Sequence, residues 1–206
     1  MQLSSQLLEK AVSAFAKLPG IGKKTALRLV LHLLKQEPGE VAHLSEAITQ
    51  LRNEIQFCTR CGNIADGPQC AICLNTRRKQ QLICVVESIR DVIAIESTQQ
   101  YNGVYHILGG IISPLDGVGP DQLTIDALLT RIKTEKTEEL IFALNPTIQG
   151  DTTIYYIQKK LQEYPIRVTT IARGVAFGGE LEYTDEMTLA RSLQNRLPVD
   201  RYVTSR

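Results

Sequence analysis

Four cysteines carry the most specific chemistry in this sequence. They form two Cys-x-x-Cys pairs, Cys58 with Cys61 and Cys70 with Cys73, and eight residues separate the pairs. Thiolates at this spacing can converge on one tetrahedral metal ion, and four cysteines leave no open coordination position for water. We therefore predict one structural Zn²⁺ per chain, which stabilises the local fold and takes no part in catalysis.

Two disulfides are the competing interpretation of the same cysteines. The sequence shows no secretory signal peptide, and a fifth cysteine, Cys84, lies within an apolar run. These features favour a reducing compartment, so we expect free thiols and a cytoplasmic location. Large apolar residues are almost absent from Glu54 to Gln80. We expect this segment to obtain its folding free energy from the metal.

A second candidate site is a glycine turn between two amphipathic helices. Apolar residues recur at helical spacing from Ser5 to Lys17 and from Lys23 to Gln36, with Leu18-Pro19-Gly20-Ile21-Gly22 between them. Free N–H groups at the start of the second helix, together with its dipole, suit a phosphate. The residues expected to contact a polynucleotide backbone are Gly20, Gly22, Lys23, Lys24, Arg28 and Lys35. An ordinary helical hairpin, in which the glycines only turn the chain, is the alternative.

The distribution of charge points to the same end of the chain. The 206 residues carry a net charge of +1, with 43% hydrophobic content. Eleven basic and six acidic residues precede Gln81, which gives +5, and the remainder carries −4. The basic end is therefore the candidate for a polyanion. No apolar run approaches the roughly 20 residues of a membrane span, so we expect no membrane association.

Alternating strands and helices are predicted after the cysteine segment. The expected strands are 81–86, 104–108, 139–144 and 166–172, and the expected helices are 90–97, 123–133, 152–163 and 187–195. Strands separated by helices predict a parallel sheet covered on both faces. The fold class is therefore α/β, with an N-terminal helical hairpin (1–53), a small four-cysteine zinc module (54–80), a parallel-sheet domain (81–178), and a C-terminal helix and tail (179–206).

Ligands of open parallel sheets bind beyond the carboxyl ends of the strands. Glu87 follows the first predicted strand, and the run Asn145–Gly150 follows the third. The candidate residues at this edge are therefore Glu87, Asn145, Thr147 and Asp151, of which only Glu87 and Asp151 carry a charge. We expect Asp151 to serve the N-terminus of the next helix.

Two local expectations concern the C-terminal part of the sequence. Arg173 follows a predicted strand and could meet a phosphate or a neighbouring subunit, or pair with Glu180 or Glu182. Thr184 or Asp185 is expected to cap the last helix.

Two of these motifs resemble known modules. The run Leu-Pro-Gly-Ile-Gly-Lys-Lys resembles the helix-hairpin-helix motif, which binds DNA without sequence specificity. The strand ending in Glu87 and the run Asn145–Gly150 resemble the Toprim domain of topoisomerases, primases and some nucleases. In that family a glutamate and an Asp-x-Asp-x-x-Gly run hold magnesium. Here Asn145 and Thr147 replace both aspartates, and magnesium needs carboxylate oxygens, which leaves Glu87 and Asp151 as possible ligands. The resemblance therefore implies a Toprim scaffold without its catalysis.

In this order and at this length, the three modules resemble the bacterial recombination mediator family RecR. The stretches Gly109–Gly119, Ala172–Val175 and Gly178–Tyr183 fit it as well. The resemblance implies a ring-like tetramer that encircles DNA and works with RecO and RecF to load the RecA recombinase at single-stranded gaps.

On this interpretation the protein is a non-catalytic DNA clamp and adaptor in recombinational DNA repair. Glu87, Asn145, Thr147 and Asp151 are then a partner-binding or vestigial Toprim site. A magnesium-dependent Toprim nuclease or primase-like enzyme is the alternative. A pure protein adaptor, in which DNA contact is incidental, is a third possibility.

Overall fold

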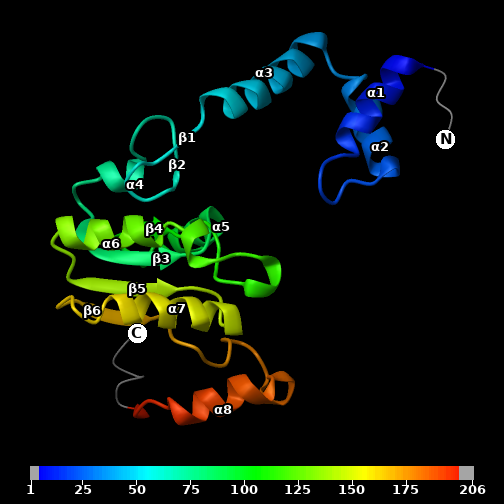
Figure 1. Ribbon diagram of the computed structural model, residues 1–206. Helices are drawn as coiled ribbons and strands as arrows, with labels where there is room; N and C mark the ends of the chain where they lie inside the picture. The colour runs from blue at the N-terminus through cyan, green and yellow to red at the C-terminus, as the bar shows by residue number, and fades with distance from the viewer. Residues whose placement is uncertain (1–4, 200–206) are drawn as a thin grey trace. The chain divides into compact units, whose positions relative to one another are not determined.

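The computed structural model describes residues 5–199 of the chain. Contacts divide the protein into two compact units, Met1–Ile55 and Gln56–Arg206, here named the first and the second unit. The first unit is helical, and the second contains both sheets, which confirms the α/β class (Figure 1).

Three helices make up the first unit: α1 (Gln6–Phe15), α2 (Lys23–Leu33) and α3 (Pro38–Glu54). The hydroxyl of Ser5 accepts a hydrogen bond from the Leu8 amide and so caps α1. The small core between α1 and α2 consists of Val12, Ala26 and Val30 with partly buried neighbours that include Ile21. The helical spacing of apolar residues thus predicted this hairpin correctly.

The third helix is an addition to what the sequence analysis predicts. Pro38 stands in the first turn of α3, where its missing N–H costs no hydrogen bond. No residue of α3 is buried, and Leu44, Ile48 and Leu51 are exposed at helical spacing. The helix therefore lacks a core partner within the described residues, although its apolar stripe is visible in the sequence.

The cysteine segment forms a small module at the start of the second unit. Strands β1 (Gln56–Phe57) and β2 (Ile64–Ala65) pair antiparallel, and the short helix α4 (Ala71–Leu74) follows them. The module's buried cluster consists of the four cysteines and Ala65, with Ile72 packed against it. As the composition predicts, few apolar residues hold this segment together.

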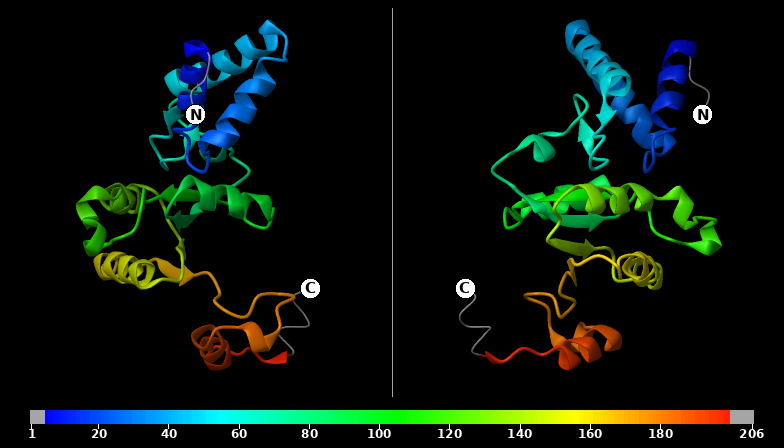
Figure 2. Two further views of the ribbon diagram at one scale, coloured as in Figure 1. Left: turned by 90° about the vertical axis from the view of Figure 1, so that its right-hand side faces the viewer. Right: turned by 60° about the vertical axis from the view of Figure 1, so that its left-hand side comes forward.

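The larger sheet is entirely parallel. Its strands are β3 (Lys79–Val86), β4 (Gly103–Ile107), β5 (Glu139–Ala143) and β6 (Arg167–Thr170), in the order β4-β3-β5-β6. The helices between them are α5 (Ile89–Ser97), α6 (Ile125–Thr134) and α7 (Ile148–Lys160), with short 3-10 turns at Pro114–Asp116 and Pro120–Gln122 (Figure 2). Val86 is in register with Ile107 on one side and with Ala143 on the other. The carboxyl ends of these three strands therefore meet at one edge.

Side chains alternate between the two faces of the sheet. Ile83 and Val85 of β3 point into a core with α6 and α7, whereas Cys84 and Val86 pack with α5 and Ile72. Burial raises the pKa of the Cys84 thiol to about 12, so this cysteine is a neutral core residue. Both faces are covered, which confirms the expected layered architecture.

Helix α7 begins four residues earlier than predicted. Thr147 is its N-cap, and the Thr147 hydroxyl accepts from the Gly150 amide at 3.0 Å. A Cβ atom at position 150 would collide with the carbonyl oxygen of Asn145, so this turn requires glycine. Helix α7 was predicted to begin later because Pro146 and Gly150 are typical of loops. The last strand is also shorter than predicted, because Ile171 and Ala172 lie beyond it.

The C-terminal part contains a 3-10 turn at Leu181–Tyr183 and helix α8 (Glu186–Gln194). The Asp185 carboxylate caps α8 by accepting from the Thr188 amide at 2.9 Å, and the hydroxyl of Thr188 contributes to lowering the Asp185 pKa. Of the two predicted caps, Asp185 is therefore the correct one.

Candidate metal centre and nucleic-acid interface

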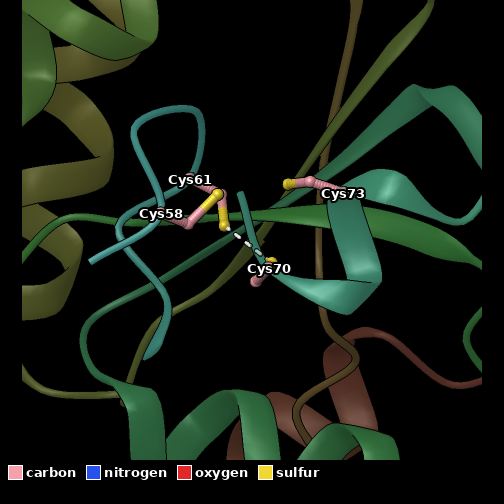
Figure 3. A group of neighbouring side chains, drawn as sticks. All are labelled: Cys58, Cys61, Cys70 and Cys73. Carbon is pink, nitrogen blue, oxygen red and sulfur yellow. Dashed lines mark hydrogen bonds between the residues drawn. The ribbon is translucent and has the colours of Figure 1, made fainter. Parts of the chain in front are cut away.

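The four cysteines converge as their spacing predicts (Figure 3). Cys58 and Cys61 lie on the turn between β1 and β2, whereas Cys70 is the residue just before α4 and Cys73 lies within it. All four Sγ atoms lie within 4.8 Å of one another, and those of Cys61 and Cys70 are 3.6 Å apart. Tetrahedral coordination with Zn–S bonds of about 2.3 Å needs sulfur atoms about 3.8 Å apart. The cluster therefore fits a tetrahedral metal ion.

The protonation of these thiols is coupled through short contacts. The Cys61 side chain hydrogen-bonds to Cys73 and lowers the pKa of Cys73 to about 6, with the positive charge of Arg131 contributing. The same contact, together with burial, raises the pKa of Cys61. A bound metal ion would displace the shared protons. All five cysteines of the chain are free, so the disulfide interpretation is wrong.

The cysteine module is attached to the edge of the larger sheet. The Ile107 amide of β4 donates to the carbonyl oxygen of Cys61 at 2.9 Å. Gly62, with φ +77°, lies against Ile107, and a Cβ there would be 3.5 Å from the Ile107 Cβ. The metal site and the sheet are thus parts of one packed unit.

The glycine turn of the first unit has the geometry expected of a phosphate site. Gly20 has a φ of +78°, which favours glycine, and half-buried Ile21 packs into the small core below the turn. Gly22 is the N-cap of α2 and has no side chain to cap it. Within residues 5–199, the amides of Lys23 and Lys24 donate to no acceptor. N–H groups, those of Lys23 and Lys24 among them, therefore remain free at the positive end of the helix dipole.

A groove of about 420 Å³ runs along the exposed side of α2. Its lining consists of three predicted cations, an imidazole and two leucines: Lys24, Arg28, Lys35, His32, Leu27 and Leu31. Among the described residues, none of the three cations has an ion-pair partner. His32 joins the groove because it lies four residues after Arg28. The groove thus presents unpaired positive charge beside the side chains of Leu27 and Leu31.

The four sequence-predicted residues at the sheet edge separate into three environments. The amide of Asn145 donates to Glu87 at 3.2 Å, so these two lie together. Thr147 is occupied with capping α7. Asp151 accepts from Arg173 and lies 3.7 Å from an Nη atom of Arg191. Among residues 5–199, the cysteines are the one group of ligand side chains whose atoms converge on a metal position.

Two sequence expectations are corrected here. Arg173 pairs with Asp151, not with Glu180 or Glu182. The expectation for Asp151 holds in part: it lies in the first turn of α7, but Thr147 is the cap, and the Asp151 pKa is lowered chiefly by the hydrogen bond from Arg173. The pairing joins residues on either side of β6, and no sequence pattern could have revealed it.

A hollow of about 400 Å³ lies beside Glu87. Its lining comes from the cysteine module and from the ends of β3 and β4: Phe57, Gly62, Glu87, Ser88, Ile89, Ile107, Gly109, Gly110 and Thr124. Phe57 is 67% exposed. The hollow is therefore an apolar surface with one carboxylate at its margin, and the cysteine module supplies one of its walls.

Among the described residues, no helix has the length and apolar character needed to cross a membrane.

Comparisons with known proteins cover nearly the whole chain. Four family models match: the RecR helix-hairpin-helix at residues 8–52, the RecR four-cysteine zinc finger domain at 55–75, the Toprim domain at 81–172 and the RecR C-terminal region at 174–197. The match to the zinc-finger model and the converging thiols together identify a structural metal site.

Curated relatives align over similar lengths. Recombination protein RecR of Amoebophilus asiaticus is 56% identical over 197 residues, which cover 96% of this chain and 98% of that protein. The protein of the same name from Flavobacterium johnsoniae is 55% identical over 201 residues, 98% of each chain. That of Cytophaga hutchinsonii is 54% identical, over 95% of this chain and 96% of its own. This chain therefore belongs to the RecR family of recombination proteins.

Proposed function

We propose that the protein is a non-catalytic DNA-binding clamp and adaptor in recombinational DNA repair. The observation that carries the proposal is the unpaired positive groove along α2, which adjoins the uncapped start of that helix. We also propose the division into a hairpin region (1–53), a zinc module (54–80), a Toprim domain (81–178) and a C-terminal region (179–206).

The proposed DNA contacts are Gly20, Gly22, Lys23, Lys24, Arg28 and Lys35. Free amides at a helix start can bind one phosphate, and cations along the helix can bind the phosphates that follow. Such contacts read backbone charge, so we expect binding without sequence preference that weakens steeply as salt rises.

The test replaces both Lys24 and Arg28 with alanine. Loss of two phosphate contacts should weaken binding to duplex and gapped DNA at least tenfold and reduce the salt slope by about 1 to 2. Fluorescence anisotropy at several salt concentrations measures both quantities. The matched control, Lys10→Ala with Lys17→Ala, removes equal charge from a separate hollow along α1. Equal losses in both double variants would remove the α2 groove from the proposal.

We assign the partner site to the hollow beside Glu87, with RecO and RecF as partners in loading RecA. An exposed phenylalanine next to an apolar wall and a single carboxylate suits a protein surface with an apolar side chain and a nearby cation. Phe57→Ala and Glu87→Gln should each weaken binding to purified RecO or RecF in calorimetry. Glu163→Gln, which removes an exposed carboxylate outside the hollow, should not.

The proposed assembly is a tetrameric ring. Apolar side chains are exposed on α3 and throughout the C-terminal part, and they include Leu44, Ile48, Leu51, Phe177, Tyr183 and Leu193. Many exposed large apolar side chains are typical of proteins with subunit interfaces. Several copies of a weak groove around one duplex also gain affinity through avidity. Native mass spectrometry with and without gapped DNA should give four times the chain mass, and a single-chain mass in both would overturn the ring.

For the metal we propose one Zn²⁺ per chain, held by Cys58, Cys61, Cys70 and Cys73. When bound, it would supply folding free energy and neutralise thiolates, and it would offer no position for a reacting water. The buried cluster fits this structural use.

The alternative is a magnesium-dependent Toprim enzyme, favoured by the position of Glu87 directly after β3. Asn145 and Thr147 give such an ion no carboxylate, and Asp151 is engaged with two arginines. Magnesium-dependent cleavage or synthesis that disappears in Glu87→Gln would replace the adaptor proposal with this one.

A further inference from the structure

The side chain of Arg60 links the cysteine module to the sheet domain. Arg60 lies between Cys58 and Cys61 in sequence, and its guanidinium group forms two parallel hydrogen bonds with Glu135, both at 2.8 Å. Its remaining nitrogen, Nη1, donates to the carbonyl oxygen of Cys73 at 3.4 Å and to the Gln80 side chain. One side chain thus spans both cysteine pairs and the end of α6.

Glu135 is shared with a second arginine. Its Oε2 atom also accepts from Nε of Arg131 at 3.0 Å. Arg131 is only 5% exposed, and its Nη1 atom donates to the carbonyl oxygen of Tyr105 in β4 at 2.7 Å. A continuous chain of hydrogen bonds therefore runs from the cysteine loop through Arg60, Glu135 and Arg131 to the edge strand.

Several polar groups on the outer side of β4 are satisfied by this arrangement. In a four-stranded sheet ordered β4-β3-β5-β6, β4 has no strand beyond it. Its polar groups are instead met by the Cys61 carbonyl at the Ile107 amide, by Arg131 at the Tyr105 carbonyl, and by the Thr124 hydroxyl at the Ile107 carbonyl. The cysteine loop and Arg131 thus take the place of a neighbouring strand.

The same chain of hydrogen bonds also places positive charge beside the metal site. Four thiolates around one Zn²⁺ leave a net charge of −2 in a buried site. Arg60 and Arg131 are cations next to this site, and Glu135 fixes the orientation of both. Partners of this kind outside the ligand set orient the ligands and tune metal affinity, and losing one typically costs about 10- to 100-fold.

We propose that Arg60, Glu135 and Arg131 form the outer shell of the metal centre and couple metal occupancy to the edge strand β4. These residues are positioning residues, because none of them touches the metal. The proposal rests on the zinc assignment made above. It predicts that a substitution that weakens this outer shell speeds both the release of zinc and hydrogen exchange at the Ile107 amide.

The experiment measures zinc transfer to a chromogenic chelator and hydrogen exchange at Ile107 in the full chain. Glu135→Gln keeps the shape of the side chain and removes its charge. Zinc should leave this variant about tenfold faster than the unchanged protein. Hydrogen exchange at the Ile107 amide should also become faster in this variant. Arg60→Lys keeps the positive charge and loses the paired geometry, so we expect an intermediate rate.

Glu96→Gln is the matched control. Glu96 also binds an arginine, Arg78, through two hydrogen bonds, and its side chain is 28% exposed, as is that of Glu135. Its zinc release should stay within twofold of the unchanged protein, because the Glu96 side chain bonds to Arg78 and the Tyr105 hydroxyl and directly to none of Arg60, Arg131 or the four cysteines.

Three outcomes would count against the proposal in different ways. Zinc loss and Ile107 exchange at unchanged rates in Glu135→Gln would overturn the outer shell and leave the zinc assignment intact. If Glu135→Gln does not fold, unchanged release from Arg60→Lys overturns the shell and faster release supports it. A purified chain without zinc, measured by native mass spectrometry, would overturn the zinc assignment and the shell together.

Discussion

Helices α2 and α7 begin in opposite ways, although glycine marks both starts. At α2, Gly22 offers no cap, the first turn contains no acidic residue, and Lys23 and Lys24 stand at the positive end of the dipole. At α7, Thr147 caps the helix, and Asp151 lies in its first turn. At the start of α7 the Thr147 hydroxyl satisfies the Gly150 amide, whereas the start of α2 has no side-chain cap, at a cost in stability. A helix start left unfavourable in this way is suited to an anion.

Gly150→Ala should have the largest effect on this comparison. The added Cβ would overlap the Asn145 carbonyl oxygen, so the turn before α7 must shift. We expect a loss of about 3 kcal/mol in the free energy of unfolding, the upper range for overpacking a well-packed site. Gly22→Ala places its Cβ in open space and should cost much less. Chemical denaturation of the two variants measures the difference, and equal costs would contradict the contrast between the two turns.

We expect acidic pH to lower the stability of the second unit, because that unit contains the buried His106. His106 is buried, with Nε2 at 3.0 Å from the Thr124 carbonyl, and desolvation lowers its pKa to about 4. The unfolded chain takes up this proton near pH 6.5, so protonation favours unfolding as the pH falls from about 6.5 to about 4.

The loss of stability from His106 should approach about 3 kcal/mol at pH 4 and vanish above pH 7. Denaturation curves between pH 4 and pH 7.5 measure it. His106→Gln, which cannot take up the proton, should show a flatter dependence. An equally steep dependence in that variant would assign the effect to other groups.

Gly22→Asp gives α2 a side-chain N-cap, which α7 already has in Thr147. The position is extended and has open space around its Cβ, so the substitution should be accommodated. Capping and the dipole should raise the free energy of unfolding by about 0.5 kcal/mol. The same carboxylate would occupy the proposed phosphate site, so DNA affinity should fall at least tenfold. Affinity and stability are thus expected to move in opposite directions, and a rise in both would contradict the assignment of this helix start to DNA.

Thr147→Ala makes the reverse change and should have the smallest effect on DNA affinity. Removing the cap of α7 should cost about 1 kcal/mol of stability and leave DNA affinity within twofold. Anisotropy and denaturation on the same preparation distinguish these outcomes. A clear loss of DNA affinity in a folded variant would mean that the start of α7 also meets the polyanion.

Features set by local spacing were predictable from the sequence. Two Cys-x-x-Cys pairs identify the metal cluster because a knuckle needs only neighbouring residues. Helical and strand periodicity likewise give the hairpin and the alternating order of the sheet domain. The start of α7 was placed too late, since Pro146 and Gly150 are typical of loops and the need for glycine at 150 comes from a carbonyl five residues earlier.

Contacts between distant residues were not predictable. Arg60 and Glu135 are 75 residues apart, and each belongs to a different predicted module. Arg173 has several acidic residues nearby in sequence, but its partner is Asp151, 22 residues before it. Charge alone does not select among such partners, because the choice depends on where the sheet places each side chain.

The covering of β4 by the cysteine loop has a consequence for newly made protein. A sheet that forms before the loop acquires its ion leaves the Ile107 amide of β4 without its Cys61 partner, and strands from other molecules can add at this edge. Zinc-starved cells should therefore accumulate this protein in inclusion bodies, so supply of the ion during synthesis would limit the soluble yield.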